Sequence, residues 1–406
     1  MTPEQQDASA RDRGKAYTWR RIQEVALESF VEKGYNGATI GEIAARAGVA
    51  ETTIYEHFRN KEDILFSIPR DFFSRLCRSL EDHFLGVDGV ENLFRKFVWH
   101  HLHFFQENPQ SSALYILELW NNPAFLETKG FSYLAEYRAR LEGILESGQR
   151  EGIFDPKLPK EICASMVLGT FNHLILSKVM LKRPLELIPY ADRLFKVFRR
   201  VLEPTDAVDQ RVFRGQEGRR KDILMAALTE FEKHGYEGAT IARIAKRAGV
   251  TQPTIYEYFK SKEDLLYSIP EVAMQDFLKS LEESLRNLDN PVNRLYNFIL
   301  HQVRSVRDAP TYYRLLIMEL RNNPGFYDSP GYRSLREYSA RFVEIVKEGA
   351  ASGYFRDDVD ITCVQNLYFG TFDDLTIQFL LDGKQQYIVG VSEYLFDLTY
   401  RALKKD

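Results

Sequence analysis

The chain has 406 residues, of which 44% are hydrophobic and 28% charged, and its formal net charge is −4 at pH 7. This length allows two or three domains of about 100 to 200 residues, each able to bury a core of its own. The sequence shows neither a run of about 18 apolar residues that would span a bilayer nor an N-terminal secretory signal, so we expect a cytoplasmic protein without a membrane partner.

Helical patterns follow one another from the N-terminal part of the chain. From about residue 17 to 33, apolar side chains recur at helical spacing, and Gly34 ends that stripe. Thr39 is placed to cap a short helix, and Gly48 to stop it. Strand signals are nearly absent, which predicts an all-α fold. The remaining predicted helices are 50–57, a long helix that begins at Lys61, and 89–107, 109–120, 127–150, 159–181 and 187–202.

The pattern returns later in the chain at a constant offset of 201 residues. Between residues 34–69 and 235–270, 24 of 36 positions are identical and no gap is needed. Beyond these segments the identity thins to glycines, aromatic residues and helix ends. The sequence therefore predicts a duplicated whole domain, not a short solenoid repeat.

Two short helices joined by a glycine turn after a longer helix form a helix-turn-helix. Small Ala44 and Ala47 permit a close helix crossing, and Ile54 holds the second helix against the first. The outward face of the second helix is left free to enter a major groove. That face carries Glu51, Thr52, Tyr55 and Glu56.

With AGV, TIY and the following Lys-Glu-Asp at matching spacing, residues 39–66 and 240–267 resemble the tetracycline-repressor (TetR) family of bacterial regulators. The resemblance implies two tandem TetR-like units, each a DNA-binding head plus a helical ligand-binding and dimerisation domain. It also implies a double-stranded DNA operator and a small-molecule effector as partners. In this family the last two helices of a unit form the dimer interface.

The resemblance assigns DNA contacts position by position. Threonines that open the first short helix are placed near phosphate, the start of the second helix reads bases, its aromatic residues lie at the groove edge, and a lysine contacts the DNA backbone. The positions are Thr39, Ala50, Glu51, Thr52, Thr53, Tyr55, His57 and Lys61 in the first copy, and Thr240, Thr251, Gln252, Pro253, Thr254, Tyr256, Tyr258 and Lys262 in the second.

The two copies differ where DNA would be read. Residues 34–69 hold three basic and five acidic residues, whereas residues 235–270 hold five basic and four acidic ones. Thr251 can cap its helix but Ala50 cannot, a difference of about 1 kcal/mol. We therefore expect the second copy to bind DNA more strongly, with a degenerate first head as the alternative.

Two basic segments, 11–21 and 211–221, each carry five Lys or Arg residues against one acid. Such local charge supplies phosphate contacts that an acidic body does not. The predicted domains are a basic arm (1–15), the first head (16–61), its helical domain (62–202), a linker (203–214), the second head (215–262) and its helical domain (263–406).

Aromatic residues crowd both helical domains, and most are expected to form cores. A remaining cavity would suit an apolar or amphipathic effector, with a lipid-like or acyl thioester compound as the precedent that the resemblance offers. The candidate ligand contacts are Phe97, His100, Trp120 and Tyr137 in the first copy and Phe298, His301, Tyr313 and Tyr338 in the second.

Signals for an enzyme or a metal site are weak. The sequence has no Gly-rich phosphate loop or nucleophile elbow. Its three cysteines are far apart, and His100 and His103 share a helical face without a nearby carboxylate or cysteine. We therefore predict no catalytic residue, no cofactor and no metal.

A fused tandem places two recognition helices in one chain, so the two repeats can form an intramolecular pseudo-dimer on an asymmetric operator. His173 stands where the second copy has Asp374, beside Asp373, and a contact between His173 and an acid of the second copy would favour this pairing. The alternatives are a further homodimer of chains, or a ligand sensor or protein-interaction module whose heads no longer bind DNA.

Overall fold

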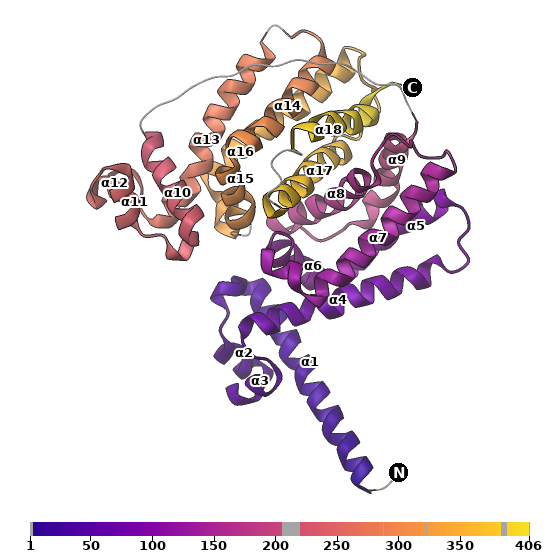
Figure 1. The fold of residues 1–406 in the computed structure, drawn as a ribbon, viewed down its shortest axis with the longest axis vertical. Coiled ribbons are helices and arrows are strands. Elements are labelled where there is room, and N and C mark those ends of the chain that lie inside the picture. The colour runs from indigo at the N-terminus through magenta and orange to yellow at the C-terminus, as the bar shows by residue number, and fades with distance from the viewer. Residues whose placement is uncertain (1–2, 205–219, 287, 322, 383–387, 406) are drawn as a thin grey trace. The chain divides into compact units, whose positions relative to one another are not determined.

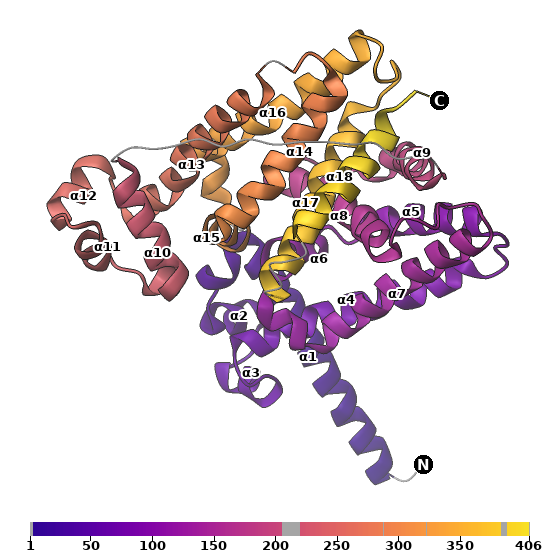
Figure 2. The same cartoon turned by 45° about the horizontal axis from the view of Figure 1, so that its top comes forward.

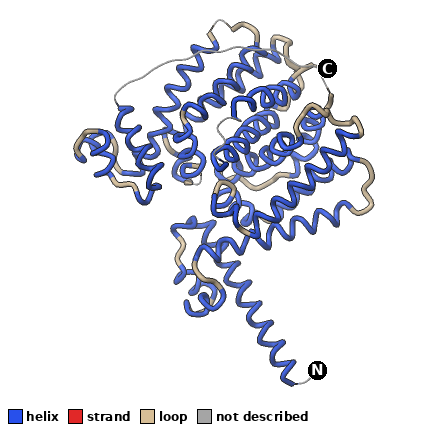
Figure 3. Tube along the Cα trace, viewed as in Figure 1, coloured by secondary structure: helices blue, strands red, loops and turns tan. Residues whose placement is uncertain are grey.

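The computed structural model describes residues 3–204, 220–286, 288–321, 323–382 and 388–405. Within these residues every regular element is a helix, and the one isolated β-bridge joins Phe355 to Lys404 (Figure 3). The predicted all-α fold class is therefore confirmed.

The first copy contains nine α-helices and three short helical turns among the described residues (Figure 1). Their bounds are α1 Pro3–Gly37, α2 Ile40–Ala47, α3 Glu51–His57, α4 Lys61–Phe84, α5 Val90–Glu107, α6 Pro109–Leu114, the π-helix η1 Tyr115–Leu119, the 3₁₀ turn η2 Pro123–Glu127, α7 Lys129–Arg150, α8 Lys160–Met180, the 3₁₀ turn η3 Ile188–Tyr190 and α9 Ala191–Leu202.

The second copy repeats this order. Its elements are α10 Arg220–Gly238, α11 Ile241–Ala248, α12 Gln252–Tyr258, α13 Lys262–Leu285, α14 Pro291–Asp308, α15 Pro310–Leu315, the π-helix η4 Leu316–Leu320, the 3₁₀ turn η5 Pro324–Asp328, α16 Pro330–Ala351, α17 Ile361–Asp382 and α18 Ile388–Leu403. Even the π-helix recurs at the same offset, so the duplication extends to local backbone geometry.

The N-terminal region differs from the prediction. A separate arm over residues 1–15 was expected, whereas α1 begins at Pro3 and its N-terminal half extends away from the other helices of the first head (Figures 1 and 2). No proline follows Pro3 in this helix, and Gly14, the one glycine before Gly34, costs only about 1 kcal/mol. The predicted linker beyond Pro204 and nearly all of the second basic segment lie outside the described residues.

The two compact units of the chain do not coincide with the two sequence repeats. Residues 1–144 and 184–191 form one compact unit, and residues 145–183 and 192–406 form the other. Thus α8 and α9, the last helices of the first copy, cluster with the whole second copy.

The second unit is built around the crossing of α8 with α17. A Cβ atom added at Gly169 would lie 2.3 Å from the carbonyl oxygen of Gly370, and one added at Gly370 would lie equally close to that of Gly169. The two backbones therefore touch, which only glycine permits. By length and hydropathy α8 alone among the described helices resembles a membrane span, but 72% of its apolar window is buried inside the protein.

The expected contact between His173 and an acid was wrong. The Nδ1 atom of His173 lies 2.9 Å from the Asn366 side-chain oxygen, and its ring stacks on Phe369. Asp373 instead accepts from Arg321 of its own copy at 2.8 Å. Burial also lowers the pKa of His173, which favours a neutral ring that needs no acidic partner.

A Gly169→Leu substitution tests the backbone contact of α8 with α17. We expect it to destabilise the full chain by about 1 to 3 kcal/mol, because the new side chain meets main-chain atoms that cannot move aside. Thermal unfolding measures the loss. The control is Gly143→Ala in α7, where an added Cβ meets nothing within 4 Å; equal melting temperatures for the Gly169 variant and the wild type would contradict the close crossing.

Candidate functional site

Both heads hold their two short helices through the same caps. The Thr39 hydroxyl accepts from the Glu42 amide at 3.2 Å, and Gly48 ends α2 in the left-handed region, with φ 73°. In the second head Thr240 accepts from the Arg243 amide at 3.3 Å, and Gly249 has φ 68°. The predicted start and stop of this helix are therefore confirmed.

The recognition helices differ in their caps, as predicted. The Thr251 hydroxyl accepts from the Thr254 amide at 3.3 Å at the start of α12, whereas Ala50 offers no side-chain cap to α3. Since a threonine cap contributes about 1 kcal/mol, α12 begins more firmly than α3.

The side chains predicted to contact DNA lie mostly on one exposed face of each recognition helix. Tyr55 and Tyr256 are 55% and 54% exposed, while Ile54 and Ile255 beside them are fully buried. Ala50, Glu51 and Thr52 are exposed, as are Thr251, Gln252, Pro253 and Tyr258; Thr53, His57 and Thr254 are half-buried. Large aromatic side chains exposed on a rigid helix are suited to a partner surface.

Lys61 holds the head together, a role that the sequence did not reveal. Its Nζ atom donates to the carbonyls of Tyr35 and Ala38 at 2.7 and 2.9 Å and lies 4.4 Å from the centre of the Tyr35 ring. Lys262 makes the same contacts with Tyr236 and Ala239. Burial lowers the pKa of Lys61. The contact of these lysines with the DNA backbone stays a prediction.

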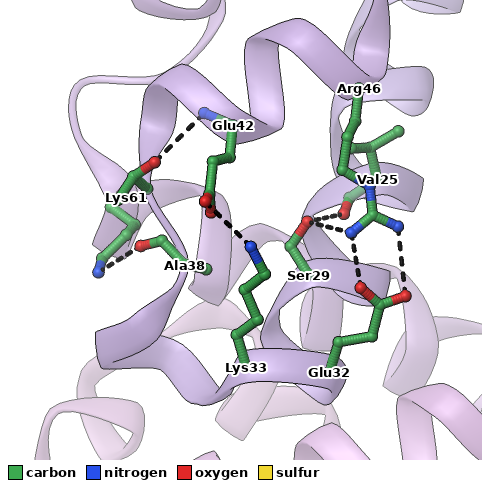
Figure 4. A network of polar contacts seen from close by, with 9 residues as sticks. Val25, Ser29, Glu32, Lys33, Ala38, Glu42, Arg46 and Lys61 are labelled. Carbon is green, nitrogen blue, oxygen red and sulfur yellow. Dashed lines mark hydrogen bonds and ion pairs between the residues drawn. The ribbon is translucent and has the colours of Figure 1, made fainter.

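A set of ion pairs locks α2 to α1 in the first head (Figure 4). Arg46 donates to Glu32 at 2.8 Å and to Glu28 at 3.0 Å, and Lys33 donates to Glu42 at 3.0 Å. The hydrogen bond from Arg46 lowers the pKa of Glu32, and that from Lys33 lowers the pKa of Glu42. These exposed pairs add little stability, but they neutralise Arg46 and Lys33.

The second head leaves more of its bases to solvent. Arg247 pairs with Glu230 at 2.7 Å, whereas Arg243 and Lys246 on α11 are exposed. In the first head, by contrast, the Glu51 carboxylate lies over the start of α2, so close that a Cβ added at Gly41 would sit 2.6 Å from it. An acid therefore lies beside the first turn of α2, the end of a helix that favours phosphate.

Glu118 connects the first head to its helical domain. This residue lies in the π-helix η1, and its Oε1 atom accepts from the Tyr35 amide at 2.9 Å. Burial raises the pKa of Glu118. The Tyr35 carbonyl also accepts a hydrogen bond from Lys61. A shift of η1 therefore acts directly on the junction of α1 with α2. Sequence reasoning missed this residue because nothing in its local pattern distinguishes it from a surface acid.

Three of the four candidate ligand residues of the first copy lie together. Phe97, His100 and Tyr137 are buried, with the rings of Phe97 and Tyr137 4.8 Å apart. His100 bonds to the Ser79 hydroxyl at 3.0 Å, and burial lowers its pKa to about 3, so it is neutral. Trp120 is half-buried.

The second copy has a more polar interior. Phe298 packs on Tyr338 with ring centres 5.3 Å apart, and the Tyr338 hydroxyl lies 3.1 Å from Nδ1 of His301. Tyr313 bonds to Ser305 at 2.6 Å. Burial lowers the pKa of His301 to about 4. The sequence did not reveal the bidentate Arg321–Asp373 pair nearby, where the first copy has Trp120 and Asn172.

Among the described residues no group of three or more His, Cys, Asp or Glu side chains is arranged to hold a metal ion. His103 stacks on Trp99 with ring centres 4.5 Å apart. The three histidines of α5 are thus placed among aromatic rings.

Two family models each match the chain twice. "Bacterial regulatory proteins, tetR family" matches residues 22–68 and 223–269, which cover the heads. "YsiA-like protein, C-terminal region" matches residues 71–200 and 271–402, the two helical domains. The chain belongs to the TetR family. Each copy contains both parts of a TetR-family regulator, so the tandem organisation is confirmed.

Two curated relatives from Bacillus subtilis each align over less than half of this chain. The "Fatty acid metabolism regulator protein" is 26% identical over 176 residues, which are 43% of this chain and 91% of the relative. The "Uncharacterized HTH-type transcriptional regulator YdgC" is 30% identical over 192 residues, 46% of this chain and 93% of that relative. Both are named as regulators, not as enzymes.

Among solved structures, the transcriptional regulator FadR from Bacillus subtilis in complex with stearoyl-CoA is 25% identical. The alignment covers 44% of this chain and 97% of that one, with a TM-score of 0.41.

A Lys61→Met substitution tests the role of the half-buried Lys61 ammonium. We expect the junction of α1 with α2 to lose roughly 1 to 3 kcal/mol of local stability, because the carbonyls of Tyr35 and Ala38 lose their donor. Amide hydrogen exchange over residues 35–61 measures this loss. Lys33→Met, which removes an exposed ion pair, is the matched control and should exchange like the wild type.

Proposed function

We propose that this protein is a ligand-responsive transcriptional repressor that acts in the cytoplasm and carries both halves of a DNA-binding dimer in one chain. The observation that carries the proposal is the packing of α8 on α17 within one compact unit. These are the equivalent helices of the two copies, and the resemblance places the dimer interface of the family there. Fusion makes this pairing intramolecular, with an effective concentration commonly near millimolar.

DNA binding is supported by the complete helix-turn-helix in both copies. Each has an exposed recognition helix with an outward tyrosine, and a half-buried lysine that holds the bend before the two short helices. The assigned side chains of α3 and α12 would enter successive major grooves, as paired recognition helices do on an operator.

The two heads would read unlike half-sites. Glu51 lies beside the first turn of α2, and Glu42 neutralises Lys33 in the first head, whereas the second head exposes Arg243 and Lys246. Phosphate contacts supply most of the sequence-independent affinity for DNA. The second head therefore provides the larger share of affinity, and the operator is asymmetric.

The effector is an apolar or amphipathic molecule of the fatty acyl class. Support comes from the aromatic interior of the first copy and from the relative that is named as a regulator of fatty acid metabolism. The neutral histidines beside Tyr137 and Tyr338 add polar groups to otherwise apolar surroundings. Effector binding would move η1 and, through Glu118, the first head; such coupling is a shift between two populated states.

Multi-angle light scattering with operator DNA from the region upstream of the gene tests the proposal. We expect the mass of one chain without DNA, and of one chain per duplex with it. A complex of two chains per duplex would reject the intramolecular pseudo-dimer in favour of a further homodimer. Failure of both heads to bind any DNA would leave a sensor or interaction module.

Exchange of Glu51 with its counterpart tests the inequality of the heads. Glu51→Gln should raise affinity for the operator several-fold, because it removes an acid from the phosphate-binding end of α2. Gln252→Glu places that acid in the second head and should lower affinity by at least as much. Fluorescence anisotropy at several salt concentrations measures both. Equal and negligible effects would show that neither side chain approaches DNA.

A further inference from the structure

The Tyr267 hydroxyl lies where the second head joins its helical domain. Tyr267 is in the second turn of α13, and its hydroxyl donates to the Glu263 carboxylate, one turn earlier, at 2.7 Å. Glu263 follows Lys262, whose ammonium donates to the carbonyls of Tyr236 and Ala239 at the bend of the head. The hydroxyl is therefore bonded to the part of α13 that holds the head.

The η5 turn leaves space for this hydroxyl. A Cβ atom added at Gly325 would lie 2.8 Å from the Tyr267 hydroxyl oxygen, a separation that Cβ atoms do not adopt. Gly325 does not have a positive φ, so its backbone conformation does not require glycine. The first copy has Ala124 at the equivalent position. Glycine at position 325 is thus explained by the hydroxyl beside it and not by the turn.

The Tyr267 hydroxyl contacts η5 as a protonated group. Burial raises the pKa of Tyr267, the bond to Glu263 raises it further, and a hydrogen bond from the Asn323 side chain opposes the rise. Asn323 also caps η5, because its side-chain oxygen accepts from the Gly325 amide at 3.0 Å. The hydroxyl therefore joins the first turn of α13 to the cap of η5.

On its other side η5 is anchored to α17. The guanidinium of Arg321 makes a bidentate pair with Asp373 of α17, with one bond of 2.8 Å, and the Asp373 side chain is fully buried. The Tyr327 hydroxyl, in η5, donates to the Arg321 carbonyl at 3.2 Å. Asp373 lies three residues after Gly370, where α17 touches α8. Polar bonds therefore lead from this contact through η5 to Tyr267.

The first copy keeps the turn but not these bonds. Asn122 accepts from the Ala124 amide at 3.0 Å, as Asn323 accepts from Gly325. The side chains that would carry the other bonds are replaced by residues without a hydroxyl, a guanidinium or a carboxylate. The replacements are Phe66 for Tyr267, Leu126 for Tyr327, Trp120 for Arg321 and Asn172 for Asp373.

We propose that Tyr267 is a positioning residue for the second head: its hydroxyl fixes the first turn of α13 to η5, and so connects the second recognition helix to the contact of α17 with α8. Its effect on DNA recognition rests on the proposed function. Because Arg321 anchors η5 on α17, a displacement of α17 moves the support of the second head. Phe66 gives the first head no such bond.

Tyr267→Phe and Gly325→Ala in the full chain test the contact. Tyr267→Phe should speed amide hydrogen exchange over residues 235–262 about two- to tenfold, as expected for the loss of one hydrogen bond, and leave residues 34–61 unchanged. Gly325→Ala should act alike, because its Cβ displaces the hydroxyl. The double variant restores the Phe–Ala combination of the first copy and should be no faster than either single variant.

Two results of this cycle would overturn the proposal. One is unaltered exchange of the second head in Tyr267→Phe, and the other is full additivity of the two substitutions. The matched control is Tyr332→Phe, which removes a hydroxyl from a ring packed on Tyr327 with ring centres 4.7 Å apart. It should exchange like the wild type; an equal acceleration by Tyr332→Phe would show a general loosening of the aromatic cluster and refute the positioning role.

Tyr327→Phe tests the connection to α17 without disturbing the buried ion pair. It removes the bond to the Arg321 carbonyl and should speed exchange over residues 235–262 by less than Tyr267→Phe does. In a Tyr267→Phe background it should add nothing. Equal increments in both backgrounds would show that η5 does not act on the head through Tyr267.

Fluorescence anisotropy with operator DNA separates this inference from the proposed function. Tyr267→Phe should lower operator affinity about two- to tenfold, because a less firmly held head must be ordered on binding. If the wild type binds no DNA, the proposed function fails, and the exchange measurements still decide whether Tyr267 positions the head. If Tyr267→Phe binds the operator like the wild type, the proposed function stands and the positioning role in recognition is refuted.

Discussion

The second compact unit depends on one close backbone contact, that of Gly169 with Gly370. Without Cβ atoms at these positions, α8 and α17 approach until main-chain atoms touch, and their long apolar surfaces are buried against each other. Burial of this kind is the main favourable term in folding. It also explains why the last helices of the first copy belong to a compact unit with the second.

Within each head, a single lysine has a comparable role on a smaller scale. Lys61 and Lys262 satisfy carbonyls at the bend where α1 and α10 turn at glycines of positive φ, and so fix the short helices that follow. The arrangement of helices in the head is the same in both copies, but the charged residues on these helices differ. Glu118 in the π-helix η1 also contacts this bend. It therefore joins the first head to the helical domain that contains the candidate ligand residues.

Most of the fold was open to prediction from the sequence because helix signals are local. Caps at Thr39 and Thr251, the stop at Gly48 and the long helix from Lys61 depend on neighbours within a few residues. The start of α1 was missed because a polar helix without an apolar stripe gives no periodic signal. The partner of His173 does not follow from charge complementarity along the chain, because Arg321, 52 residues before Asp373, already holds that carboxylate.

The sequence by itself determined the helical class, the duplication and the family, because these depend on periodicity, spacing and a constant offset. Only the tertiary structure decided that Lys61 is held by carbonyls, that Glu118 meets Tyr35, and that Asp155 pairs with Arg401. Residues 155 and 401 are separated by most of the second copy, and no local pattern marks two charges as partners. Their pairing is fixed by the crossing of α8 with α17, which brings the ends of both copies into one buried place.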